Sequence, residues 1–161
     1  MRRFLAFTLV TITAACSTAD AAPDGVLAQT RTSDPDLPTV LVYKTPTCGC
    51  CNGWVEHMEA AGFVVDARNT TDLMTVKRDG GVPPQMSSCH TAIIDGYVVE
   101  GHVPADQVKQ LLTERPEVAG IAVPGMPIGS PGMEGPNARP YQVLSFTHTG
   151  EADVFATVDP R

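Results

Sequence analysis

The feature that most constrains this chain is a cluster of three cysteines in four residues, Cys48-Gly49-Cys50-Cys51. An apolar segment, 40–43, precedes the cluster, and a segment with apolar residues at helical spacing, 54–61, follows it. We therefore expect the thiols to lie between the end of a buried strand and the beginning of a helix. Backbone N–H groups and the helix dipole favour negative charge there, and the thiolate is the form of cysteine that binds metals or attacks disulfides.

The N-terminus has the form of a secretory signal peptide over residues 1–21. Arg2-Arg3 precedes the apolar run 4–12, and Ala19-Asp20-Ala21 fits a cleavage site. A second interpretation is a lipoprotein signal with Cys16 as the lipidated residue, which would anchor the protein to a membrane. Both interpretations predict export. Residues 22–38 are polar without apolar periodicity, so they predict a flexible linker before a single domain over 39–161.

The domain pattern predicts the element order β-α-β-α-β-β-α. The predicted strands are 39–44, 63–65, 88–94 and 97–100, and the predicted helices are 54–61, 72–78 and 104–114. Asp95-Gly96 between two apolar runs predicts a hairpin. This order is that of an α/β thioredoxin-like fold, in which a proline precedes the third strand beside the cysteines. Pro83 or Pro84 would take that place, and we hypothesise a cis peptide bond there.

The remainder of the chain divides into a loop and a C-terminal extension. Residues 121–136 are rich in Gly, Pro and Met, which predicts neither helix nor sheet. Segments 141–147 and 152–158 predict a short C-terminal β extension. Met58 and Met74 are predicted to lie in the core, whereas methionines of the irregular loop are available as thioether ligands.

The cysteine cluster favours a soft metal, because neighbouring thiolates repel one another unless a cation compensates them. Cu(I) prefers thiolate and thioether ligands, whereas zinc requires a tetrahedron that adjacent Cys50 and Cys51 make awkward. The predicted topology adds Cys89 as a fourth thiolate. His90 joins it only if the third strand begins after Cys89, because neighbouring strand residues face opposite sides. The predicted copper ligands are Cys48, Cys50, Cys51, Cys89, His90, Met126 and Met133.

A redox function is the alternative, since Cys48 and Cys51 have the C-x-x-C spacing of dithiol oxidoreductases. In that interpretation Cys48 is the nucleophile and Cys51 the resolving thiol. The third cysteine between them, Cys50, offers a second resolving thiol and so disturbs a two-thiol exchange site. Nucleic acid is not an expected partner, because the net charge is −7 and no Lys/Arg cluster is present to track phosphates.

Four sequence blocks, in this order, resemble the CopG-like family of bacterial periplasmic copper-resistance proteins, also known as domain-of-unknown-function family 411. The blocks are Tyr43–Cys51, Ser88–Ala92, Asp95–Pro104, and Val123–Pro127 continuing through Gly132–Glu134. The resemblance covers about residues 40–134. It implies a thioredoxin-like fold and a periplasmic protein that binds copper at Cys48, Cys50, Cys51 and Cys89, as one ion or as a multinuclear cluster.

The resemblance also implies a role in copper tolerance, with Cu(I)/Cu(II) interconversion as a candidate activity. Whether the protein is an enzyme or a metal-binding protein therefore stays open. Copper ions are the expected ligand, and other envelope copper-handling proteins are the expected partners. A membrane is expected as a partner only if Cys16 is lipidated.

Overall fold

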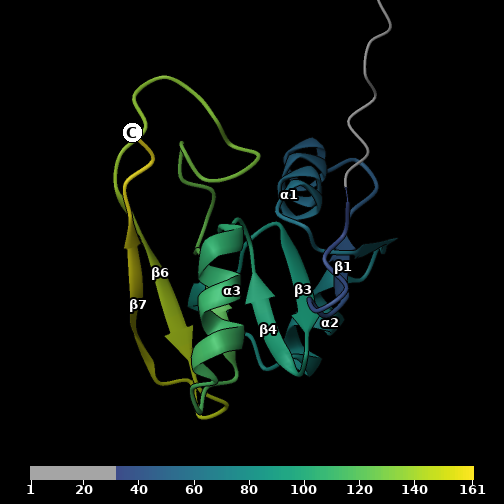
Figure 1. Ribbon diagram of the computed structural model, residues 1–161. Helices are drawn as coiled ribbons and strands as arrows, with labels where there is room; N and C mark the ends of the chain where they lie inside the picture. Colours follow the sequence, from purple (N-terminus) through teal and green to yellow (C-terminus); the bar gives the residue numbers. More distant parts are fainter. Residues whose placement is uncertain (1–31) are drawn as a thin grey trace, which may run out of the picture. The chain divides into compact units, whose positions relative to one another are not determined.

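The computed structural model describes residues 32–161. The predicted signal peptide, Cys16 and the first part of the predicted linker lie outside the described residues. Residues 32–161 form a mixed α/β domain around one seven-stranded sheet with the strand order β2-β1-β3-β4-β5-β6-β7 (Figure 1). Among these residues, no helix is both long enough and apolar enough to cross a membrane.

The elements from β1 to α3 follow the predicted order β-α-β-α-β-β-α. The strands are β1 Val40–Lys44, β2 Val65–Asn69, β3 His90–Ile94, β4 Tyr97–Glu100, β5 Gly120–Ala122, β6 Tyr141–Phe146 and β7 Ala152–Val158. The helices are α1 Gly49–Ala60, α2 Leu73–Asp79 and α3 Ala105–Glu114, with a 3-10 turn, η1, at Pro84–Met86. The two predicted C-terminal strands are present as β6 and β7, which pair with each other in antiparallel fashion.

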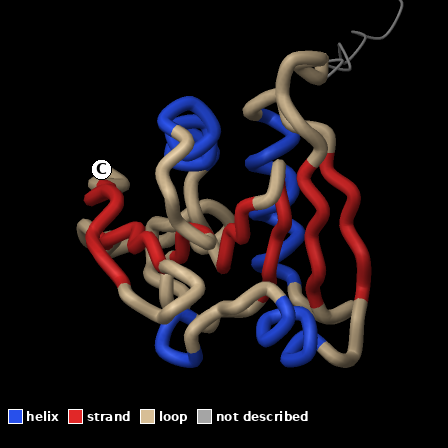
Figure 2. The backbone as a smooth tube through the Cα atoms, turned by 90° about the horizontal axis from the view of Figure 1, so that it is seen from below, coloured by secondary structure: helices blue, strands red, loops and turns tan. Residues whose placement is uncertain are grey.

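The centre of the sheet positions the cysteine region. β1 pairs in parallel with β2 and antiparallel with β3. Trp54 of α1 contacts His90 at the beginning of β3, whereas Lys77 of α2 bonds to the next residue, Thr91. Because neighbouring strand residues face opposite sides, α1 and α2 cover opposite faces of β3. Figure 2 shows helices above and below the strands in the same way.

The apolar core lies mainly between the sheet and helices α1 and α3. Val42 of β1, Trp54 of α1 and Leu111 of α3 are all fully buried there. Asp72 begins α2 by accepting a hydrogen bond from the Thr75 backbone N–H at 3.2 Å, which satisfies one of the free donors at a helix N-terminus. At the other end of the sheet from the cysteines, the Asp34 N–H donates to the Gly62 carbonyl at 2.8 Å, so part of the predicted linker contacts the domain.

Three predicted elements differ from those observed. The strand predicted at 63–65 is displaced, because pairing with β1 places β2 at Val65–Asn69, where the residues after Val65 are exposed and mostly polar and give no apolar pattern. Helix α1 begins at Gly49 instead of residue 54, because Cys48 takes the extended N-cap conformation and the cysteines themselves enter the first turn. The segment 120–122 forms the strand β5, although the sequence around it predicts only an irregular loop. Pairing with β4 on one side and β6 on the other supplies the hydrogen bonds that stabilise so short a strand.

Two predictions about single residues are wrong. Met74, predicted to lie in the core, is 67% exposed because it lies on the solvent side of the short helix α2, whereas Met58 is buried as predicted. The hypothesised cis bond at Pro83 or Pro84 is not present, since every peptide bond in residues 32–161 is trans. Pro84 instead begins η1, a position in which proline's fixed φ angle is favourable and its missing N–H has no cost.

Candidate metal site

Four cysteine sulfur atoms meet at the N-terminus of α1. Cys48 is the N-cap residue, Cys50 and Cys51 lie in the first helical turn, and Cys89 comes from the loop before β3. The four Sγ atoms all lie within 4.8 Å of one another. Cys51 is fully buried, whereas the other three are half-buried. The predicted cysteine cluster is therefore assembled from two segments about forty residues apart in sequence.

The four sulfurs are in two chemical states. Cys48 and Cys51 form a disulfide, whereas Cys50 and Cys89 are free thiols. The sulfur of the free thiol Cys50 lies 3.5 Å from the sulfur of Cys48, so the free thiol is close to the disulfide. Burial, followed by the effect of the Cys50 thiol, raises the pKa of Cys89 to about 12. The Cys89 sulfur of the metal-free protein therefore carries a proton at neutral pH.

An imidazole that the sequence interpretation did not include also contacts the cluster. His102 is fully buried, and its Nε2 lies 2.8 Å from Cys89 Sγ. Its Nδ1 lies 2.7 Å from the Pro131 carbonyl oxygen, which is only an acceptor, so Nδ1 carries the hydrogen and donates it. Nε2 is therefore left with its lone pair directed at Cys89. Burial lowers the pKa of His102, which favours this neutral form.

His90 is the second imidazole beside Cys89. Its Nδ1 lies 3.5 Å from Cys89 Sγ, and its ring contacts Trp54 with a centroid distance of 4.5 Å. Its Nε2 is buried and has no hydrogen-bond partner among residues 32–161. Burial lowers the pKa of His90 to about 3, so the ring is neutral. A buried nitrogen without a partner is costly unless a ligand satisfies it, and neutral imidazole is the form that binds metal.

Cys89 belongs to both potential metal-binding groups. One group consists of the four cysteines, and the other of Cys89, His90 and His102. β3 begins at His90, so Cys89 lies just before the strand and the condition for both residues to be ligands is met. Thiolates and imidazoles are ligands that copper accepts, so the residues present fit such an ion.

The structure brings together five of the seven predicted ligands, and the other two lie in the 123–136 loop. Met126 is 50% exposed and Met133 is half-buried. The loop reaches the site through its backbone, because Ser88 Oγ donates to the Gly125 carbonyl at 2.5 Å. The ligand roles of Met126 and Met133 stay predictions.

The sequence contains one signal that places His102 beside Cys89, the length of the hairpin turn. The hairpin turn at residues 95–96 sets the register in which Ile94 pairs with Tyr97 and Thr91 with Glu100. Continued by two residues, this register places residue 102 opposite Cys89. A two-residue turn therefore predicts the proximity, although it does not predict the burial of the imidazole.

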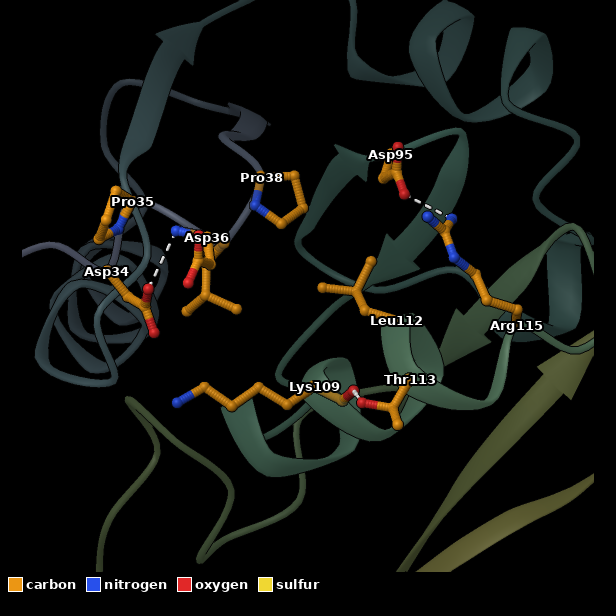
Figure 3. A pocket seen from close by; sticks show the side chains of 10 residues that line it. Asp34, Pro35, Asp36, Pro38, Asp95, Lys109, Leu112, Thr113 and Arg115 are labelled. Atoms are coloured by element: carbon orange, nitrogen blue, oxygen red, sulfur yellow. Dashed lines mark hydrogen bonds and ion pairs between the residues drawn. The ribbon is translucent and has the colours of Figure 1, made fainter.

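A separate surface hollow of about 590 Å³ lies among residues 34–38, the hairpin turn and the C-terminal part of α3 (Figure 3). Its two basic residues have partners, because Arg115 forms an ion pair with Asp95 and Lys109 donates to the Ala61 carbonyl. Its lining contains neither cysteine nor histidine. The hollow therefore lacks the soft ligands that characterise the cysteine site.

Comparison with known proteins gives one family and two solved structures. The family described as "Protein of unknown function, DUF411" matches residues 86–133, which include Cys89, His90 and His102. The chain is similar to a structure described as copper resistance protein CopG, form 2, with 46% identity and a TM-score of 0.73. That match covers 77% of this chain and all of the other. Form 1 of the same protein matches with 46% identity and a TM-score of 0.72, covering 76% of this chain and 98% of the other. No curated protein sequence matches the chain.

Proposed function

This chain belongs to the CopG-like copper resistance family, and from that premise we propose that it binds Cu(I) in the cell envelope as part of copper tolerance. The observation that carries the proposal is the group of four cysteine sulfurs, all within 4.8 Å of one another. Cys48, Cys50, Cys51 and Cys89 supply the thiolates, and His90 and His102 supply neutral nitrogen ligands beside Cys89. The strand order and the position of the cysteines after β1 support a thioredoxin-like fold.

Charge favours a multinuclear site over a single ion. Four thiolates carry four negative charges, and one Cu(I) ion would leave three of them uncompensated in a half-buried position. Several Cu(I) ions bridged by the same sulfurs remove most of that charge. All four sulfurs are available only after the Cys48–Cys51 disulfide is reduced, so full copper binding requires the reduced protein.

Copper stoichiometry of a Cys50→Ser variant tests the proposal. Protein expressed for export and reduced is loaded with Cu(I), and its copper and sulfur coordination are measured by elemental analysis and X-ray absorption. We expect at least two Cu(I) per wild-type chain and a sharp loss in the variant, with circular dichroism confirming that the variant folds. Unchanged copper content in Cys50→Ser would contradict the proposal.

The methionine ligands need a separate test with a matched control. Met126→Leu removes the thioether of the half-exposed loop residue, and Met74→Leu removes an exposed thioether on α2, away from the cysteines. If Met126 binds copper, its substitution weakens Cu(I) affinity whereas the Met74 control does not. Equal affinities for the two variants would remove Met126 from the ligand set. The same comparison applies to Met133→Leu.

The Cys48–Cys51 disulfide supports a second candidate function, a redox reaction at this site. Its reduction takes up two electrons and two protons and yields two thiols. A dithiol substrate can supply both, as in a thiol–disulfide oxidoreductase, or two Cu(I) ions can each supply one electron and become Cu(II) while the two protons come from solvent water. The metal-free protein would then catalyse insulin reduction or thiol oxidation, and Cys48→Ser would not. Inactivity of metal-free wild-type protein in both assays would exclude the dithiol reaction.

A further inference from the structure

A buried ion pair lies on the side of β3 opposite the histidine ring of His90. Lys77 Nζ of α2 and Glu100 Oε1 at the end of β4 are 2.5 Å apart, and the two side chains are 5% and 0% exposed. Thr91 completes the network, because its hydroxyl donates to Glu100 Oε2 at 2.7 Å and accepts from Lys77 at 3.1 Å. Both oxygens of the carboxylate therefore have partners.

The same carboxylate reaches the backbone beside Cys89. The Ser88 N–H donates to Glu100 Oε1 at 2.6 Å, which fixes the peptide unit next to the half-buried cysteine. The residue that follows Glu100 has to be glycine. Gly101 has φ +72, and a Cβ atom there would overlap the Ser88 side chain and lie 2.8 Å from the Val123 carbonyl oxygen.

The segment 100–102 therefore holds the segment 88–91 at three successive points. Glu100 binds the Ser88 N–H and the Thr91 hydroxyl, the Gly101 N–H donates to the His90 carbonyl at 3.1 Å, and His102 contacts the Cys89 sulfur. These contacts fix the backbone on both sides of Cys89 as well as its sulfur.

Stability alone gives no reason for a buried charge pair at this position. Removing two ions from water costs several kcal/mol each, and well-packed apolar replacements of buried ion pairs are often neutral or stabilising. Such replacements cannot, however, accept a hydrogen bond from the Ser88 N–H. The function of Glu100 that an apolar side chain cannot reproduce is therefore its contact with the backbone that carries Cys89.

We propose that Glu100 is a positioning residue that holds Cys89 beside the other three sulfurs before copper binds, with Lys77 compensating its charge. This inference rests on the proposed copper site. Groups that orient metal ligands typically change metal affinity 10–100-fold when they are removed. Glu100 acts through the backbone and needs no contact with the metal.

Two double variants isolate the hydrogen bond from the charges. Lys77→Met with Glu100→Gln removes both charges but keeps a carbonyl oxygen that accepts from the Ser88 N–H, and the amide group can donate to Thr91. Lys77→Met with Glu100→Met removes the charges and the acceptor together. Leu111→Ala in α3 is the control for stability, because Leu111 is fully buried in the apolar core and has no polar side-chain atom that could join this hydrogen-bond network.

The first measurement is hydrogen exchange of the Ser88 amide in the metal-free, reduced protein, and the second is Cu(I) affinity by competition with a chromophoric chelator. We expect the Glu100→Met double variant to exchange Ser88 at least tenfold faster and to bind Cu(I) about 10–100-fold more weakly than wild type. The Glu100→Gln double variant is expected to stay near wild type in both. Leu111→Ala is expected to unfold at lower temperature with unchanged affinity.

The two proposals fail in different ways. Equal Ser88 exchange in the two double variants, or wild-type affinity in the Glu100→Met double variant, would overturn the positioning role. Absence of Cu(I) binding by wild-type protein would overturn the proposed function, and the exchange measurement would still report on the hydrogen bond. If the methionine variant does not fold, Lys77→Met with Glu100→Leu removes the same acceptor.

Discussion

Helix α1 and the 123–136 loop approach each other closely at Gly53 and Gly132, and this approach allows a matched test of the packing. A Cβ atom added at Gly53 would lie 2.9 Å from Gly132 Cα, whereas one added at Gly49 would meet nothing within 4 Å. Alanine gains about 0.5–1 kcal/mol of helix stability over glycine. At Gly53 this gain is opposed by an overpacking cost of about 1–3 kcal/mol, because the contact is with backbone that cannot rotate away.

We therefore expect Gly49→Ala to raise the free energy of unfolding by up to about 1 kcal/mol and Gly53→Ala to lower it by up to about 2.5 kcal/mol. Urea unfolding followed by the fluorescence of the single tryptophan, Trp54, measures both under the same redox conditions. Gly132→Ala should be destabilised as well, because φ is +81 and its Cβ would lie 2.8 Å from the Trp54 backbone nitrogen. If Gly53→Ala proves as stable as Gly49→Ala, the loop does not pack on α1 as described and the reasoning fails.

Three further predictions concern the same region. His57 Nε2 accepts the Ala105 N–H at 3.0 Å at the beginning of α3, and burial lowers the pKa of His57. The stabilising effect of neutral His57 should be complete above its ordinary pKa of 6.5 and should decline as the pH falls below that value. The thermal unfolding temperature of His57→Gln should therefore depend less on pH between about 7.5 and 5 than that of wild type. Trp54→Phe leaves the buried Val103 carbonyl without its 2.7 Å hydrogen bond and should cost about 1–3 kcal/mol in urea unfolding; a smaller loss would mean that another donor replaces the indole. Protein oxidised to the Cys48–Cys51 disulfide should bind fewer Cu(I) ions than reduced protein, and equal stoichiometry by elemental analysis would contradict the four-thiolate site.

Patterns that depend on local sequence predicted the central part of the fold. The apolar runs and the Asp95-Gly96 turn predicted β1, β3, β4 and the hairpin between β3 and β4, because period and turn chemistry act within a few residues. The strand predicted at 63–65 overlaps β2 only at Val65. The beginning of α1 was misplaced because Cys48 caps it without a side-chain hydrogen bond, so the usual capping residues gave no signal. β5 was missed because its stability comes from strands distant in sequence.

The candidate site was only partly predictable for the same reason. The cysteine spacing indicated three thiols, and the topology added the fourth, but the burial of His102 depends on the Pro131 carbonyl, which comes from the irregular loop. The network of Lys77, Thr91 and Glu100 gave no signal at all in the sequence. A charged residue at the end of a strand normally indicates solvent, and only the tertiary structure shows that Glu100 is buried and paired.

The two candidate functions share Cys48 and Cys51 but differ in their use of Cys50 and Cys89, and this difference makes them separable by mutation. A disulfide between Cys48 and Cys51 and a site with four thiolates cannot exist together, because the disulfide sulfurs carry no negative charge for a metal. Cys48 is required by both functions, so its loss does not distinguish them. Cys50 and Cys89 are free thiols that the proposed copper site uses and C-x-x-C exchange does not. A variant lacking Cys50 that loses copper but still cycles between dithiol and disulfide would therefore show that the redox chemistry is independent of the metal.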